Sequence, residues 1–213
     1  MRIPNHIGVI PDGNRRWAAQ RGLPKEMGYR EGLEPGLKLL RLCRDMGVKE
    51  LTYYGFTVDN TKRPAPQTKA FIQACIESIA MIAEEDVSLL VMGNTQSKMF
   101  PRELLPYTRR TNVGKGGMRV NFLVNYGWEW DLSNLLAAQQ HRKKVTKGIK
   151  SNDISRVDLL IRWGGRRRLS GFLPAQSVYA DFYVIDDYWP DFQEKHFYDA
   201  LNWYDSQDIT LGG

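Results

Sequence analysis

Short apolar, β-prone runs alternate along the chain with stretches of helical periodicity, and no other feature restricts the choice of fold as strongly. Such alternation is typical of a parallel sheet that is covered by helices. The runs predict about six strands, at residues 6–10, 51–54, 87–91, 118–124, 157–161 and 181–185. We therefore predict an α/β fold, with a single doubly wound domain over residues 1–213 and a mostly parallel sheet flanked by helices.

Two amphipathic helices are predicted between the strands. One carries its apolar face at Leu33, Leu37, Leu40 and Met46, and the other at Phe71, Cys75, Ile79, Ile82 and Ala83. The second helix should begin near Pro64 and Pro66, because proline is tolerated in the first turn of a helix but not in its interior.

The charge balance favours an anionic partner. Thirty Lys and Arg residues against 24 Asp and Glu give a net charge of +6, which suits phosphorylated metabolites, nucleic acid or an acidic membrane surface. The two cysteines lie in apolar stretches, which argues against a disulfide framework and fits a reducing cytoplasm. No apolar run approaches the roughly 20 residues that span a bilayer, and residues 1–4 lead into a strand without a signal peptide. We expect a cytoplasmic protein that is at most peripheral at the membrane.

The segment Pro-Asp-Gly-Asn-Arg-Arg-Trp follows the first predicted strand, at residues 11–17. A turn at the carboxyl end of a parallel strand points backbone N–H groups outward, and glycine lets an anion approach the main chain. Arg16 adds a guanidinium suited to phosphate oxygens. Asp12 would repel a phosphate unless Mg²⁺ bridged the two. Taken alone, the segment is better explained by helix capping and solvated arginines.

A second motif occupies residues 161–172, at the end of the predicted strand at 157–161. It reads Ile-Arg-Trp-Gly-Gly-Arg-Arg-Arg-Leu-Ser-Gly-Phe. Three consecutive arginines repel one another, so a counter-ion is expected. A diphosphate or an RNA backbone could be this counter-ion. Alternatively, the three arginines are exposed to solvent and bind no ligand.

A third polar segment follows the predicted strand at 51–54. Thr57, Asn60 and Arg63 could hydrogen-bond a ligand at the carboxyl edge of the sheet. An ordinary polar turn explains the same residues equally well.

In this order and spacing, the motifs resemble the cis-prenyltransferase family, whose familiar activity is undecaprenyl diphosphate synthesis. The resemblance runs through HIGVIPDGNRRW at 6–17, FTVDNTKRP at 56–64, NYG at 125–127, DLLIRWGG at 158–165, RLSGFL at 168–173, YAD at 179–181 and WPDF at 189–192. It implies a doubly wound sheet with a hydrophobic tunnel and a homodimer. We expect the helix and strand at 71–92 to line the tunnel, although ordinary core packing explains their apolar residues equally well. The activity it implies is elongation of an allylic prenyl diphosphate with isopentenyl diphosphate, with Mg²⁺ as cofactor and a cis double bond in the product.

The resemblance also assigns roles to residues. Catalysis falls to Asp12, Thr57 and Asn60, and metal binding to Asp12 and Asp181. Substrate binding falls to Gly13, Asn14, Arg15, Arg16, Trp17, Lys25, Tyr29, Arg63, Arg162, Arg167, Arg168 and Ser170. A diphosphate oxygen would take the proton lost after condensation, with Asn60 or Thr57 as relay.

Departures from the family pattern gather on the acceptor side. Arg167 replaces a histidine, Arg166 an acidic residue and Asp181 a glutamate, and Thr-Leu-Gly at 210–212 replaces Arg-x-Gly. On the donor side, Lys25 and Tyr29 replace an arginine and a histidine. We infer that donor ionisation is retained and acceptor recognition is altered, which makes transfer to an isoprenoid without a diphosphate, or to an alcohol, an alternative.

Two further classes compete with these enzymes. A noncatalytic prenyltransferase-like subunit would lack the catalytic aspartate, whereas this chain keeps Asp12, Asn14 and Arg16. An RNA-binding protein would need an RNP-type aromatic strand or a zinc knuckle, and neither occurs in the sequence. We therefore expect no nucleic-acid partner.

Overall fold

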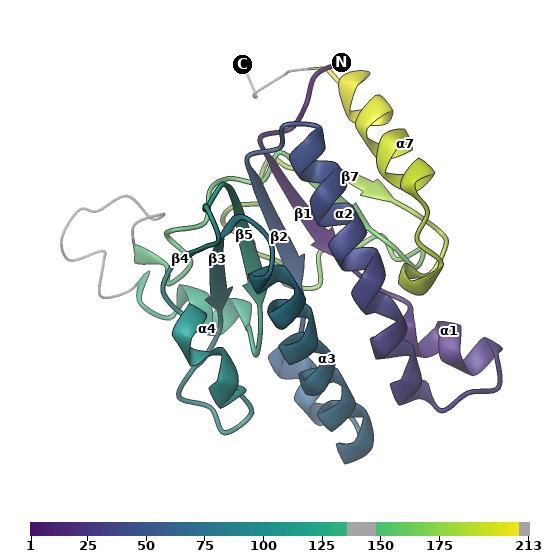
Figure 1. The fold of residues 1–213 in the computed structure, drawn as a ribbon, viewed down its shortest axis with the longest axis vertical. Helices are drawn as coiled ribbons and strands as arrows, with labels where there is room; N and C mark the ends of the chain where they lie inside the picture. The colour runs from purple at the N-terminus through teal and green to yellow at the C-terminus, as the bar shows by residue number, and fades with distance from the viewer. Residues whose placement is uncertain (136–147, 209–213) are drawn as a thin grey trace.

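The computed structural model describes residues 1–135 and 148–208. Its centre is a seven-stranded sheet in the order β4-β3-β5-β2-β1-β6-β7 (Figure 1). The strands are β1 (His6–Ile10), β2 (Glu50–Tyr54), β3 (Val87–Met92), β4 (Thr111–Val113), β5 (Met118–Leu123), β6 (Leu159–Arg162) and β7 (Asp181–Val184). Every neighbouring pair is parallel except β3 and β4. The predicted α/β fold with a mostly parallel sheet is confirmed.

The strand predictions differ from the structure at an edge and at some ends. The antiparallel edge strand β4 was not predicted, because Thr-Asn-Val has no apolar pattern and lies beside one neighbour alone. The strand expected at 157–161 runs instead from Leu159 to Arg162. Before it, Asp158 accepts hydrogen bonds from the backbone N–H groups of Asn5 and His6, at 2.8 and 3.0 Å.

The two predicted helices are present. The α-helices of the described chain are α1 (Asn14–Gln20), α2 (Leu33–Asp45), α3 (Ala65–Ala83), α4 (Trp128–Leu132) and α7 (Glu194–Asp205). The 3₁₀ helices are η1 (Lys25–Gly32), η2 (Val58–Lys62), η3 (Arg102–Tyr107) and η4 (Trp189–Asp191). As predicted, α3 begins beside Pro64 and Pro66, and α2 ends just before Met46. None of the described helices has the length and apolar character that crossing a membrane requires.

The sheet separates two apolar cores. Helices α2, α3 and α7 cover one face (Figure 1), where Ile7 and Val9 of β1 meet buried residues of all three helices. The opposite face has a smaller core in which Ile10 and Leu160 pack near Phe172. The residues of β1 are all buried, as expected for a central strand covered on both sides.

Gly8, in the middle of β1, carries a testable packing constraint. A Cβ atom at this position would lie 2.7 Å from two carbons of the Phe172 ring and 2.9 Å from Leu160. We expect Gly8→Ala to lower the free energy of unfolding by about 1–3 kcal/mol, the usual cost of overpacking a core. Urea unfolding followed by circular dichroism measures it.

Gly36 of α2 provides the matched control. A Cβ there would meet no neighbour closer than 3.9 Å. Gly36→Ala should leave stability unchanged or raise it by up to about 1 kcal/mol, because alanine favours helices over glycine. Equal unfolding midpoints for the two variants would contradict the packing argument.

Candidate active site

A cleft of about 620 Å³ opens where β1, β2 and β6 end. Residues just after each of these strands line it, since β1 leads into Asp12, β2 into Thr57, and Arg162 is the last residue of β6. Ligands of open parallel sheets bind at this carboxyl edge. The three motifs of the sequence therefore meet in one cleft.

Most of the predicted site residues line the cleft. They are Asp12, Gly13, Asn14, Arg15, Arg16, Lys25, Tyr29, Thr57, Asn60, Arg63, Arg162, Arg168 and Ser170. The lining also includes Arg166, Asp59 and Phe71, which were not predicted as site residues. Arg166 belongs to the run of three arginines, and this position is the sequence feature that could have identified it as a cleft residue. Phe71 fitted the apolar face of a helix, so its pattern did not distinguish it from core.

Three predicted residues do not line the cleft. The Trp17 indole donates a 2.8 Å hydrogen bond to Asp191, so it fastens α1 to η4. Arg167 is exposed, in the turn beyond Arg166. Asp181 begins β7 opposite Leu159, whereas Arg162 pairs with Val184 at the other end of that strand. Three residues of strand correspond to about 10 Å, so the two predicted metal ligands, Asp12 and Asp181, lie apart in this chain.

Asp12 and Arg162 form the ion pair at the base of the cleft. The Asp12 Oδ2 atom lies 2.8 Å from Nη2 of Arg162, and Oδ1 accepts a 2.6 Å hydrogen bond from the Gly13 N–H. Arg16 approaches Oδ1 at 3.3 Å. Burial by itself would raise the pKa of Asp12, but the hydrogen bond and charge of Arg162, together with Arg16 and Gly13, hold that pKa below its usual value. Asp12 is therefore ionised at neutral pH.

Arg162 is fixed in place by the following loop. Its side chain is 5% exposed, and it donates to Oγ of Ser170 at 2.9 Å and to the Arg168 carbonyl. The Tyr54 hydroxyl donates to the Ser170 carbonyl at 2.8 Å, which ties the loop to β2. A buried guanidinium with this many bonds presents a fixed positive charge to the cleft.

Gly164 brings this loop close to the first motif. It adopts φ +82, and a Cβ atom there would lie 2.5 Å from Nη2 of Arg16. The carbonyl of Gly164 accepts a 2.8 Å hydrogen bond from Nη1 of Arg16. Glycine is the residue that allows both the left-handed backbone and the approach.

Tyr29, Arg63 and Phe71 form a cluster on the other side of the cleft. Nη1 of Arg63 donates to the Tyr29 hydroxyl at 2.8 Å, and the Tyr29 and Phe71 rings stack at 4.4 Å with 5° between their planes. Burial raises the pKa of Tyr29 above its ordinary value. The phenol keeps its proton, which it can donate in a hydrogen bond to a ligand oxygen.

Thr57 and Asn60 cap η2. The Thr57 N–H donates to Oδ1 of Asn60 at 2.9 Å, in a capping box that begins the helix. The amide oxygen of Asn60 is thus engaged, and its amide hydrogens are the groups it offers to a ligand. This arrangement suits Asn60 to hold an anionic oxygen rather than to accept a proton.

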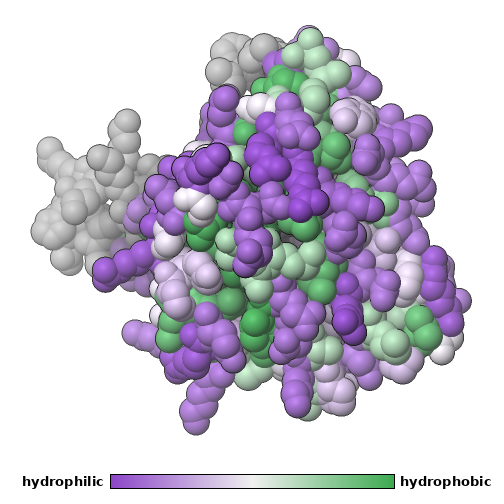
Figure 2. Space-filling model, in the orientation of Figure 1, coloured by the Kyte–Doolittle hydropathy of each residue, from purple (hydrophilic) through white to green (hydrophobic). Residues whose placement is uncertain are grey.

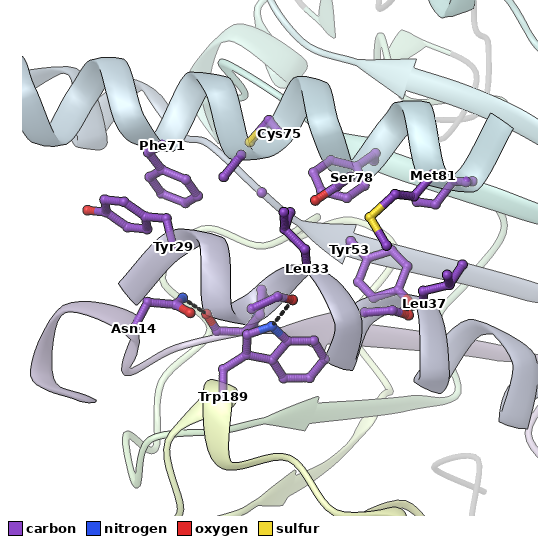
Figure 3. A pocket seen from close by; sticks show the side chains of 17 residues that line it. Asn14, Tyr29, Leu33, Leu37, Tyr53, Phe71, Cys75, Ser78, Met81 and Trp189 are labelled. Atoms are coloured by element: carbon purple, nitrogen blue, oxygen red, sulfur yellow. Dashed lines mark hydrogen bonds between the residues drawn. The ribbon is translucent and has the colours of Figure 1, made fainter. Parts of the chain in front are cut away.

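The cleft is strongly cationic and continues into an apolar pocket. Seven Arg and Lys side chains line it against two carboxylates, those of Asp12 and Asp59. The apolar pocket lies between α2 and α3 (Figure 3), and the two cavities share Pro11, Asn14, Tyr29, Gly55 and Phe71. The geometry suits a ligand with a diphosphate head and a hydrocarbon tail.

The predicted lining of this pocket needs a correction. Helix α3 contributes as expected, but β3 does not, because α2 and the central strands β2 and β5 form the remaining walls, with Leu33, Tyr53 and Phe122 among the lining residues. The reason is topological, since β5 lies between β3 and β2 in the sheet.

Of the two carboxylates that line the cleft, Asp59 pairs with Lys62 at 2.7 Å, and Asp12 lies at the base of the cleft. Across residues 1–135 and 148–208, no group of three or more His, Cys, Asp and Glu side chains could hold an ion. Mg²⁺ is commonly bound by one or two carboxylates together with phosphate oxygens. The Asp12 side chain, 31% exposed, fits that requirement once a diphosphate is present. Residues 210–212 lie outside the described residues.

Fold and site together are those expected of an α/β enzyme whose ligand has a diphosphate head and an apolar chain. The family model described as undecaprenyl diphosphate synthase matches residues 10–212, and this chain belongs to that family. It is a transferase of prenyl groups, as the resemblance of its motifs predicted.

Individual relatives agree with this assignment. An isoprenyl transferase of Leptospira interrogans serovar Lai is 34% identical, with 99% of this chain and 95% of the relative covered. A ditrans,polycis-undecaprenyl-diphosphate synthase of Aliivibrio fischeri, specific for (2E,6E)-farnesyl diphosphate, is 29% identical, with 99% and 89% covered. Lavandulyl diphosphate synthase from Lavandula x intermedia, solved with dimethylallyl diphosphate, shares the fold with a TM-score of 0.80, 24% identity and 99% of each chain covered.

Arg162 should contribute directly to diphosphate binding. We expect Arg162→Lys to weaken binding of inorganic diphosphate at least about tenfold, because an ammonium cannot reproduce the planar fork that bonds Asp12, Ser170 and Arg168. Isothermal titration calorimetry measures the affinity. Arg109→Lys, an exposed arginine outside the cleft, is the control and should bind like the wild type. Wild-type affinity in Arg162→Lys would contradict the assignment.

Proposed function

We propose that this protein ionises an allylic prenyl diphosphate and condenses it with isopentenyl diphosphate, giving a cis-polyprenyl diphosphate and inorganic diphosphate. The continuity of the cationic cleft with the apolar pocket at Tyr29 and Phe71 carries this proposal. It lets the head of the donor lie among guanidinium groups while its chain lies between α2 and α3. The complex of lavandulyl diphosphate synthase with dimethylallyl diphosphate supports an allylic diphosphate as donor.

The first step is cleavage of the allylic carbon–oxygen bond. It yields a delocalised carbocation and a diphosphate that gains negative charge, so fixed cations near the leaving group lower the barrier. Arg16 and Arg63 both line the cleft, and Arg16 is oriented by its bond to Gly164. No nucleophilic side chain is required. The apolar pocket excludes water, which would otherwise capture the cation.

In the second step, the double bond of isopentenyl diphosphate attacks the cation, and a proton is then lost. Arg162, Arg168 and Ser170 line the β6 side of the cleft, and in this proposal they hold the acceptor diphosphate. A diphosphate oxygen takes the proton. Asn60, through its amide hydrogens, orients that oxygen and does not itself act as the base.

Asp12 would hold Mg²⁺, which would supply positive charge that stabilises the departing diphosphate. The carboxylate is ionised and partly exposed, and it provides the oxygen ligand that Mg²⁺ prefers. The homodimer, the cytoplasmic location and peripheral membrane contact stay predictions.

The alternative acceptors are less well supported by the cleft. Arg166, which stands where the family has an acid, lines the cleft and adds positive charge. An additional cation favours an acceptor that carries a diphosphate over an alcohol or an isoprenoid without one. Asp12 is ionised and lies in the cleft, which also disfavours a noncatalytic subunit.

Replacing Asp12 tests the proposal. Asp12→Asn should lower kcat with an allylic diphosphate and labelled isopentenyl diphosphate by about 10²–10³-fold, the loss typical of one electrostatic group at a developing charge. Product formation is followed by mass spectrometry with Mg²⁺ present, and melting temperatures are compared because Arg162 also loses its anionic partner.

Asp199→Asn is the matched control. Asp199 pairs with Lys195 on the surface of α7, outside the cleft, and its substitution should leave kcat within about threefold. An Asp12→Asn protein that folds and retains wild-type turnover would refute the proposed role, and a wild-type protein without turnover would favour the noncatalytic reading.

A further inference from the structure

The segment at residues 185–189, directly after β7, joins the two motifs that form the cleft. The N–H groups of Gly164 and Gly165 donate to carbonyls of this segment at 2.8 and 2.9 Å, and its Trp189 N–H donates to the Asp12 carbonyl at 3.0 Å. These main-chain bonds hold the arginine-rich loop and the first motif in a fixed relation to each other. The segment itself belongs to neither motif.

Tyr188, within this segment, packs its ring against the first motif. A Cβ atom at Gly13 would lie 2.6 Å from a carbon of the Tyr188 ring. The guanidinium carbon of Arg16 lies over the same ring, 5.0 Å from its centre. The Tyr188 hydroxyl accepts a 3.3 Å hydrogen bond from the Gln20 amide, which lies on α1 together with Arg16. Tyr188 is half-buried and does not line the cleft, so its effect on a ligand there must pass through Gly13 and Arg16.

The ring holds Arg16 without occupying its hydrogen-bond donors. An aromatic face attracts a cation through its quadrupole and is not a conventional hydrogen-bond acceptor. Nη1 of Arg16 donates to the Gly164 carbonyl at 2.8 Å, and Nη2 lies 3.3 Å from Oδ1 of Asp12. Because a guanidinium carries five N–H donors, others stay available for ligand oxygens. The Arg16 side chain is 36% exposed, and these three contacts restrict its orientation before any ligand arrives.

We propose that Tyr188 is a positioning residue, which holds the Arg16 guanidinium in the orientation that binds the diphosphate of the allylic donor. This inference rests on the proposed function and adds a residue to its donor site. A side chain that is ordered in advance loses less conformational freedom when the ligand binds. A fixed cation also stabilises the charge that develops on the leaving group without having to reorient.

Binding of inorganic diphosphate tests the proposal. Tyr188→Leu removes the aromatic face and keeps an apolar side chain, and it should weaken binding about three- to tenfold, the range for one cation–π contact. Tyr188→Phe keeps the face and should recover the affinity to within about twofold of the wild type. Isothermal titration calorimetry measures both. Wild-type affinity in folded Tyr188→Leu, or an equal loss in Tyr188→Phe, would overturn the proposal.

Two further variants control for folding. Tyr188→Met also lacks an aromatic face but fills irregular space more readily, so it replaces Tyr188→Leu if that variant does not fold, with the same expected loss. Tyr198→Leu, at a tyrosine on α7 that is 38% exposed and outside the cleft, should bind diphosphate like the wild type. A loss in Tyr198→Leu equal to that in Tyr188→Leu would overturn the proposal.

The titrations need moderate salt, because hydrophilic side chains cover much of the face drawn in Figure 2 and the net charge is +6. At about 0.15 M salt, attraction between exposed charges is largely screened beyond about 8 Å. Weak binding of diphosphate elsewhere on the surface is then reduced, and the measured affinity reports on the cleft.

A double-mutant cycle tests whether Tyr188 acts through Arg16. Arg16→Ala is expected to weaken diphosphate binding, and six other Arg and Lys side chains of the cleft keep the affinity measurable. Adding Tyr188→Leu to Arg16→Ala should then change the affinity by less than about twofold, because the partner of the ring is already absent. A further loss as large as that in the single Tyr188→Leu variant would overturn the proposal.

Turnover distinguishes positioning from a general loosening of the segment. With dimethylallyl or farnesyl diphosphate as donor, whichever the wild type uses faster, Tyr188→Leu should lower kcat/KM for the donor about three- to tenfold. The KM for isopentenyl diphosphate should stay unchanged, because the bonds from Gly164 and Gly165 do not involve the ring. An equal effect on both substrates would overturn the proposal. A wild-type protein without turnover would refute the proposed function, and the binding cycle would still decide the role of Tyr188.

Discussion

The ion pair between Asp12 and Arg162 joins two adjacent central strands at the edge where the cleft forms. Arg162 is buried at the end of β6, and a guanidinium in that environment needs an anion and further acceptors. Asp12 supplies the anion, while Ser170 and the Arg168 carbonyl supply the acceptors. The same contacts orient the arginine-rich loop over the cleft. Fold and site are thus linked through one interaction.

Much of this arrangement could be predicted from the sequence, because strand ends are where motifs converge. Asp12, Thr57 and Arg162 each follow or end an apolar run, and parallel strands bring such ends to one edge. Trp17 was predicted to bind substrate, but it lies on α1 and its indole donates a hydrogen bond to Asp191. This orientation depends on where η4 packs, which the local sequence does not determine. Asp181 does not reach the cleft because it is the first residue of β7, as the predicted strand at 181–185 indicated. The amino end of a parallel strand lies away from the carboxyl edge at which the cleft forms.

The apolar pocket illustrates what sequence patterns leave open. Leu33, Leu37, Phe71 and Cys75 occupy helical positions that would suit an ordinary core. Whether α2 and α3 leave space between them depends on side chains contributed by distant strands, such as Tyr53 and Phe122. The hydroxyl of Tyr53 donates a hydrogen bond to the Gly36 carbonyl, which joins the β2 wall of the pocket to α2. The existence and the length of a cavity are tertiary properties.

The surplus of cations around the cleft has opposite effects on the two ends of the catalytic cycle. Long-range attraction speeds the diffusional capture of diphosphate esters, an effect that dissolved salt screens. Inorganic diphosphate carries more charge than the ester from which it is cut, so the same field retains the by-product more strongly than the substrate. The charge that favours capture of the substrate therefore opposes release of inorganic diphosphate.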